Sequence, residues 1–131
     1  MDQESGWRRR AILLAGDVIV LVVVTAVGFA SHRTLGSAGS RMLSTFVPLV
    51  LAWFMVAPFL GAYDPERATD FRQLWRPFWA MVLAGPMAAL LRGFWLNSPI
   101  LPIFVVVLGG ISALSILGWR LIFALLAARR G

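Results

Sequence analysis

Four long apolar runs, separated by short segments that hold most of the charged residues, constrain this chain more than any other feature. The runs cover about residues 11–30, 43–62, 77–96 and 100–120, and about twenty apolar residues are enough for an α-helix to cross the hydrocarbon core of a bilayer. The chain has 131 residues, of which 60% are hydrophobic and 14% charged, and a soluble domain of this size cannot bury so much apolar surface. The sequence therefore predicts a single-domain, all-α membrane protein whose four transmembrane helices form two hairpins.

The first and the last apolar runs raise the question of where the membrane segments end. The first run follows the basic head Trp7-Arg8-Arg9-Arg10, an order that also occurs in secretory signal peptides. However, the run is longer than the apolar part of such a signal and contains Asp17, so we expect an uncleaved first helix. The apolar pattern of the last run continues past Arg120, which predicts a cytoplasmic helical tail over residues 121–131.

The polar stretch between the second and third runs has its own pattern. Asp64 followed by Pro65 is a typical helix start, because the carboxylate can accept backbone N–H bonds and proline suits the first helical position. Apolar residues then recur on one helical face from Phe71 onward, and charged residues occupy the other face. The pattern predicts a short interfacial helix over 64–76 in the plane of the lipid headgroups. A plain cytoplasmic loop is the alternative.

The arginines indicate the orientation of the chain. If the N-terminus lies in the cytoplasm, nine of the twelve fall on the cytoplasmic side, and only Arg33, Arg41 and Arg92 lie outside. Such an excess of positive charge is typical of cytoplasmic segments. We therefore expect a multi-pass protein of the plasma membrane of a prokaryote, with both termini in the cytoplasm. The nine are Arg8, Arg9, Arg10, Arg67, Arg72, Arg76, Arg120, Arg129 and Arg130.

Composition argues against several classes of function. A net charge of +6 would suit nucleic-acid binding in a soluble protein, but here the arginines flank apolar runs, so the bilayer is the expected partner and nucleic acid is not. The chain has no cysteine and one histidine, which excludes disulfides, thiolate metal sites and a multi-histidine metal centre within one chain. It also lacks a glycine-rich phosphate loop, a serine triad and a paired-carboxylate site. We expect no catalytic residues, metal or cofactor, and no enzyme activity.

Four polar residues inside or beside the apolar runs are the candidate site residues. Asp17 lies about 9 Å inside the first run, where a carboxylate is costly and is either functional or paired. Counting inward along the last run places Arg120 at a similar depth, which predicts an Asp17–Arg120 ion pair, with Arg76 as the second choice. Arg92 lies near the opposite face and should be out of range. His32, at the outer end of the first run, is a weak candidate for binding a cofactor.

Small residues recur at intervals of four in the third and fourth runs. The pairs are Ala84 with Ala88, Gly85 with Ala89, and Gly109 with Ala113. Such pairs allow two helices to approach closely. They predict tight helix packing and leave open which helix is the partner.

These residues together resemble a known family, the prokaryotic membrane proteins catalogued as domain of unknown function 3054. The resemblance covers about residues 11–120, and it implies four helices without a known activity. One departure is Phe29, because the family often has arginine after this glycine, which weakens a role for charge around His32. The resemblance rests on Gly16-Asp17, on Gly28-Phe29-Ala30-Ser31-His32, on Pro48 with Trp53, on Gly85-Pro86 with Leu91-Arg92, and on Gly118-Trp119-Arg120.

Two hypotheses of function follow. The first is a non-enzymatic accessory or assembly subunit of a membrane complex, bound to other membrane subunits or to itself. The second is a small oligomeric transporter in which Asp17 couples transport to protons, and it requires an oligomer because four short spans cannot easily enclose a pathway. An enzyme acting on lipid headgroups is less favoured, since no nucleophile or base is evident.

Overall fold

The computed structural model describes residues 2–31 and 39–130 of the chain. This part of the chain is helical almost throughout, and the four predicted helices are confirmed: four helices are long and apolar enough to cross a membrane. His32 lies outside the described residues. The elements are α1 (Asp2–Ser31), α2 (Gly39–Val56), the 3-10 turns η2 (Ala57–Leu60), η3 (Arg67–Thr69) and η4 (Phe71–Gln73), α3 (Trp75–Leu96) and α4 (Pro102–Arg130).

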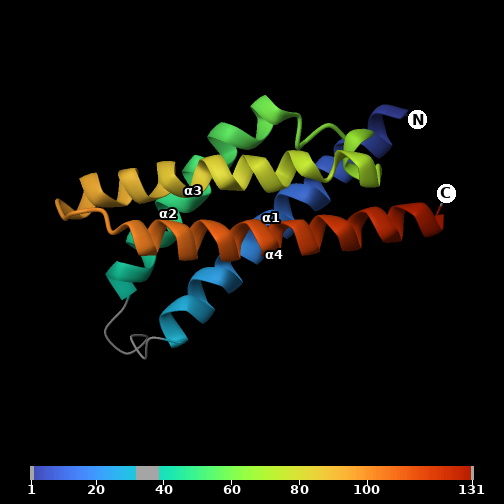
Figure 1. Cartoon of the computed structure of the whole chain (residues 1–131). Coiled ribbons are helices and arrows are strands. Elements are labelled where there is room, and N and C mark those ends of the chain that lie inside the picture. The colour runs from blue at the N-terminus through green and yellow to red at the C-terminus, as the bar shows by residue number, and fades with distance from the viewer. Residues whose placement is uncertain (1, 32–38, 131) are drawn as a thin grey trace.

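The four helices run alternately in opposite directions (Figure 1). Both chain termini lie at one end of the bundle, here called the proximal end, together with the segment that joins α2 to α3 (Figure 1). The turn from α3 to α4 lies at the other, distal end (Figure 1). Neighbouring helices pack most closely from α2 to α3 and from α3 to α4, whereas α1 packs more sparsely against α2 and α4. The helices therefore form a ring in which α1 is the most loosely held member.

A compact core fills the centre of this ring. Every helix contributes to it: Leu21 comes from α1, Leu49 and Trp53 from α2, Met81 from α3 and Ile116 from α4, and each of these side chains is fully buried. Most of the other large apolar side chains point outward. An apolar exterior of this kind is expected of helices that face lipid, because the bilayer is as good a solvent for these side chains as a protein core.

The small residues of α3 and α4 face each other. A β-carbon at Gly85 would lie 2.9 Å from the Cα of Gly109, which is closer than real β-carbons approach. Ala84, Ala88 and Ala113 are buried beside this contact. The predicted close packing is thus confirmed, and it takes place between two helices of the same chain.

The end of α2 is shaped by Pro58. Proline has no backbone N–H and therefore cannot continue an α-helical hydrogen-bond pattern, and α2 gives way to the 3-10 turn η2 at Ala57. Gly61 follows with a positive φ of 71° and donates its N–H to the carbonyl of Pro58. This left-handed residue turns the chain back across the proximal end, where the site described below is formed.

The segment over 64–76 differs from the single interfacial helix predicted for it. It contains two 3-10 turns, η3 and η4, and α3 begins only at Trp75. The Asp64 carboxylate accepts the N–H of Glu66 at 3.0 Å, as expected of a helix start. A second such start interrupts the helix, because Asp70 is extended (φ −102°, ψ 119°) and its carboxylate accepts the N–H of Arg72 at 2.9 Å. Short aspartate side chains compete with the backbone for hydrogen bonds in this way.

Candidate functional site

The predicted Asp17–Arg120 pair is present and connects α1 to α4. Nη2 of Arg120 lies 2.8 Å from Oδ2 of Asp17, and Nε lies 3.1 Å from Oδ1. Both side chains are buried, with 0% of Asp17 and 2% of Arg120 exposed. The two parallel bonds form a bidentate pair, the arrangement in which a guanidinium holds a carboxylate most strongly.

The same carboxylate receives two more donors from the end of α2 and the segment after it. The Tyr63 hydroxyl donates to Oδ2 of Asp17 at 2.5 Å, and Nε1 of Trp53 lies 3.2 Å from the same oxygen and 2.7 Å from the Tyr63 oxygen. Arg120 uses its remaining nitrogen, Nη1, to donate to the carbonyl of Ala62 at 2.7 Å. The network therefore ties α1, α2, α4 and the connecting segment together at one point.

Tyr63 is held in its protonated form at this site. Its burial, together with the nearby negative charge of Asp17, raises the pKa of the hydroxyl well above the ordinary value. The Arg120 guanidinium also lies over the tyrosine ring, with Cζ 5.1 Å from the ring centroid. A protonated hydroxyl can donate to the carboxylate, so the electrostatics and the hydrogen bond favour the same state.

A steric contact accompanies the ion pair one residue earlier on each helix. A β-carbon built at Gly16 would overlap the indole ring of Trp119, so this ring lies directly on the backbone of α1. Nε1 of Trp119 is buried and has no hydrogen-bond partner among the described residues. The dipeptides Gly16-Asp17 and Trp119-Arg120 therefore face each other. Gly16 is in close contact with Trp119, and Asp17 forms the ion pair with Arg120.

The other candidate residues lie elsewhere. Arg92 is at the distal end, where Nε donates to the Thr45 hydroxyl at 3.1 Å and the guanidinium covers the Phe104 ring at 4.9 Å. This is consistent with the expectation that it is out of range of Asp17. Arg76 lies at the proximal end but donates to the carbonyl of Leu60 at 2.7 Å, so it supports the chain turn instead of Asp17.

Sequence reasoning did not identify two of the side chains around Asp17. Trp53 enters the sequence analysis only through the family resemblance, and Tyr63, which directly follows the second apolar run, does not enter it. The available signal was that Tyr63 is the only tyrosine in the chain and follows a proline and a glycine that could turn it back toward the bundle. Polar aromatic residues buried next to a charge usually find a hydrogen-bond partner.

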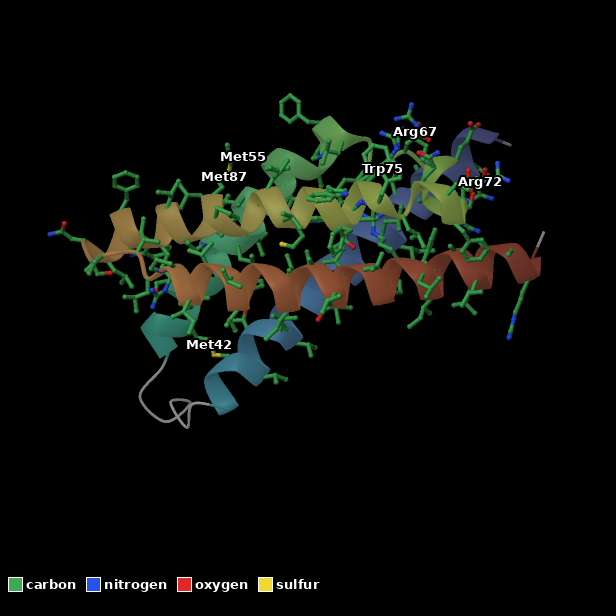
Figure 2. The ribbon with its side chains drawn as sticks, in the orientation of Figure 1. Met42, Met55, Arg67, Arg72, Trp75 and Met87 are labelled. Atoms are coloured by element: carbon green, nitrogen blue, oxygen red, sulfur yellow. The ribbon has the colours of Figure 1, made fainter. Side chains whose placement is uncertain are left out.

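A cleft opens beside this network. It is an open cleft of about 1190 Å³ between the first turns of α1 and the segment from Pro58 to Glu66, and Tyr63 forms part of its wall. Arg67, on the segment at this end of the bundle, is labelled in Figure 2. Among residues 2–31 and 39–130 there is no group of three or more histidine, cysteine or acidic residues that could hold a metal ion.

Fold and site together define an all-α protein whose four helices are long and apolar enough to cross a membrane and are fastened by a buried ion pair. The chain belongs to the family described as protein of unknown function DUF3054, whose model matches residues 14–123. This range contains Gly16, Asp17, Trp119 and Arg120, so the whole network lies within the family domain. No curated protein matches the chain, and no solved structure does.

Proposed function

We propose that this protein is a non-enzymatic subunit of a membrane complex that crosses the plasma membrane of a prokaryotic cell four times, with both termini in the cytoplasm. Arginine is concentrated at the proximal end, which carries the basic head of α1, the segment between α2 and α3, and the end of α4 (Figure 1). The positive-inside tendency supports the cytoplasmic side for this end.

The geometry of Asp17 supports a structural role for the site. Two nitrogens of Arg120, the Tyr63 hydroxyl and the Trp53 indole all donate to this one carboxylate. Removing such a carboxylate would leave a buried arginine unpaired, which is strongly destabilising. A site built in this way holds helices together, and the contacts with other molecules then fall to the outer surface of the bundle.

One observation on that surface carries the proposal: two unobstructed glycines on the outward face of α4. Gly110 and Gly118 are eight residues apart, on either side of Leu114, and all three residues are exposed. Nothing lies within 4 Å of the position that a β-carbon would take at either glycine. Glycine on the surface of a membrane helix allows the backbone of another helix to approach closely, whereas Gly109 on the other face of α4 already contacts α3.

The test is whether another protein packs against α4 at Gly110 and Gly118. The full chain, purified in mild detergent, should carry a co-purifying membrane protein or a second copy in native mass spectrometry. Gly110→Leu and Gly118→Leu should reduce this association, while Gly28→Leu, at an exposed and equally unobstructed glycine of α1, should leave it unchanged. Detection of the monomer alone, or equal association in all three variants, would contradict the proposal.

Proton-coupled transport by an oligomer is the second candidate, and one contact favours it. The Tyr63 hydroxyl bonds Asp17 while its side chain lines the open cleft. A proton entering the cleft is therefore one side chain away from the buried carboxylate. Release of protons by the purified protein on addition of candidate substrates, abolished in Asp17→Asn, would favour transport over a purely structural role.

A further inference from the structure

The open cleft at the proximal end has two clear limits. Near the N-terminus, a β-carbon at Gly6 would lie 3.9 Å from Cγ of Pro65, so α1 touches the connecting segment there. Toward the centre of the bundle, Tyr63 forms part of the cleft wall, and its hydroxyl donates to Asp17. Gly6 and Asp17 are eleven residues apart, about 16 Å along a helix. The cleft lies between these contacts and is open at its side.

Charges of both signs line the cleft without pairing to each other. Arg9 and Arg10 come from α1, and Asp64 and Glu66 come from the opposite wall. Within the described part of the chain neither arginine forms an ion pair with either acid; Asp64 is instead 3.6 Å from Arg67, and that pair is exposed. One wall of the cleft thus presents two arginine side chains and the other wall presents two carboxylates. The two walls do not form ion pairs with each other.

We propose that this cleft binds the headgroup of a phospholipid that carries both a phosphate and a primary ammonium group. The phosphate would lie against Arg9 and Arg10, because guanidinium groups bind phosphate oxygens in a bidentate manner. The ammonium would lie against Glu66 and Asp64, whose oxygens accept its N–H groups. A zwitterionic headgroup interacts favourably with both walls at once, whereas an anionic headgroup offers no cation to the carboxylates.

The position of the cleft favours a lipid over a soluble zwitterion. It opens where the basic head of α1 meets the apolar run, and Trp7 forms part of its rim. Tryptophan and arginine at the start of a membrane helix usually mark the level of the headgroups. A headgroup at this level keeps its acyl chains beside the outward apolar residues of α1, such as Ile12 and Ile19. The site does not depend on the proposed subunit role.

The test compares two lipids and two pairs of matched variants. The full chain in mild detergent is titrated with phosphatidylethanolamine or with phosphatidylglycerol, and bound lipid is counted by native mass spectrometry. We expect tighter retention of phosphatidylethanolamine. Glu66→Gln and Arg10→Gln should each weaken this retention about fivefold, the size of effect that a partly exposed ion pair provides.

Glu4→Gln and Arg8→Gln are the controls, because both residues are exposed on the same turns of α1 and do not line the cleft. They make the same chemical change at the same end of the bundle and should retain phosphatidylethanolamine as the original chain does. All four sites are at the surface, so melting temperatures without added lipid should agree. Equal retention of the two lipids, or equal losses in cleft and control variants, would overturn the proposal.

Discussion

Burying a carboxylate in an apolar bundle costs several kcal/mol unless both its charge and its hydrogen-bonding capacity are matched. Asp17 meets both conditions, since Arg120 supplies the opposite charge and Tyr63 and Trp53 supply further donors. Arg120 in turn uses its third nitrogen on the carbonyl of Ala62. The stability of the site therefore depends on partners from separate parts of the chain, and the effects of changing them should not be additive.

A double-mutant cycle tests this dependence. Asp17→Asn and Arg120→Gln should each lower the free energy of unfolding by about 3 kcal/mol or more, because each leaves one buried charge without its partner. The double variant should lose clearly less than the sum of the two, since neither charge then remains. Unfolding in detergent is the measurement, and strictly additive losses would show that the two side chains do not interact.

Gly16 is predicted to be sensitive even to a single methyl group. Gly16→Ala would place its β-carbon in the Trp119 ring, and overpacking of this kind costs about 1–3 kcal/mol. Gly28→Ala is the matched control, because nothing lies near that position and alanine favours helix by up to about 1 kcal/mol over glycine. We expect Gly16→Ala to lower the melting temperature and Gly28→Ala to raise it. A higher melting temperature for Gly16→Ala would contradict the contact with Trp119.

The ionisation of Tyr63 can be followed directly, because it is the only tyrosine. Its burial and the Asp17 charge raise its pKa in the folded protein, whereas the unfolded chain should ionise near the usual value of about 10. Below about pH 10 both states are protonated and stability is unaffected; above it only the unfolded state ionises, so stability falls as pH rises. Tyrosinate absorbance should stay absent from the folded protein above pH 10, and appearance of the signal at the ordinary pKa would contradict this burial.

At the scale of elements, the connection between α2 and α3 positions residues that form hydrogen bonds with the ion pair. The turn at Gly61 brings Ala62 and Tyr63 back to the proximal end of α1 and α4. Arg76 fixes this turn from the first residues of α3 through the carbonyl of Leu60. The connection is therefore part of the site although it contains no long helix.

The orientation of this connection gives a prediction for spin labels, which are simple to place because the chain has no cysteine. Phe71 and Trp75 are apolar and exposed, and Glu66 and Arg72 are charged and exposed. Labels at the first two positions should be relaxed by oxygen dissolved in lipid, and labels at the other two by a water-soluble nickel complex. Water exposure at all four positions would mean that the connection lies clear of the membrane surface.

The sequence was informative where a single pattern determines the result. Long apolar runs predicted four helices, and counting residues along two of them was enough to pair Asp17 with Arg120. The connection was predicted less well, because two aspartates compete as helix starts and the choice depends on local hydrogen bonds of Asp70. The positions of Trp53 and Tyr63 around Asp17 depend on the positive φ of Gly61 and on the path after Pro58, which no periodicity reveals.

At the scale of the whole molecule, the ion pair relates the depths of the first and last helices. Asp17 lies seven residues past Arg10, about 10 Å along α1, and Arg129 lies nine residues past Arg120, about 13 Å along α4. Because Asp17 and Arg120 touch, the basic residues at the two ends lie at nearly the same level. We therefore infer that the membrane boundary is near Arg129, so that residues 121–128 lie in lipid and not in a cytoplasmic tail.

Single-cysteine labelling tests both this depth and the orientation of the chain. Ile122 and Leu126 are 53% and 51% exposed, so cysteines there should react quickly with a membrane-impermeant maleimide if the tail is in water and should stay unreactive if lipid covers them. We expect no reaction at Ile122→Cys or Leu126→Cys, in intact or in opened cells.

The same labelling tests the orientation of the chain. Glu66→Cys should react only in opened cells and Asn97→Cys in intact ones, since arginine is concentrated at the proximal end. Labelling of Glu66→Cys in intact cells would show that the topology is the reverse of the one proposed. Fast labelling of Leu126→Cys in opened cells would place the membrane boundary near Arg120 instead of Arg129.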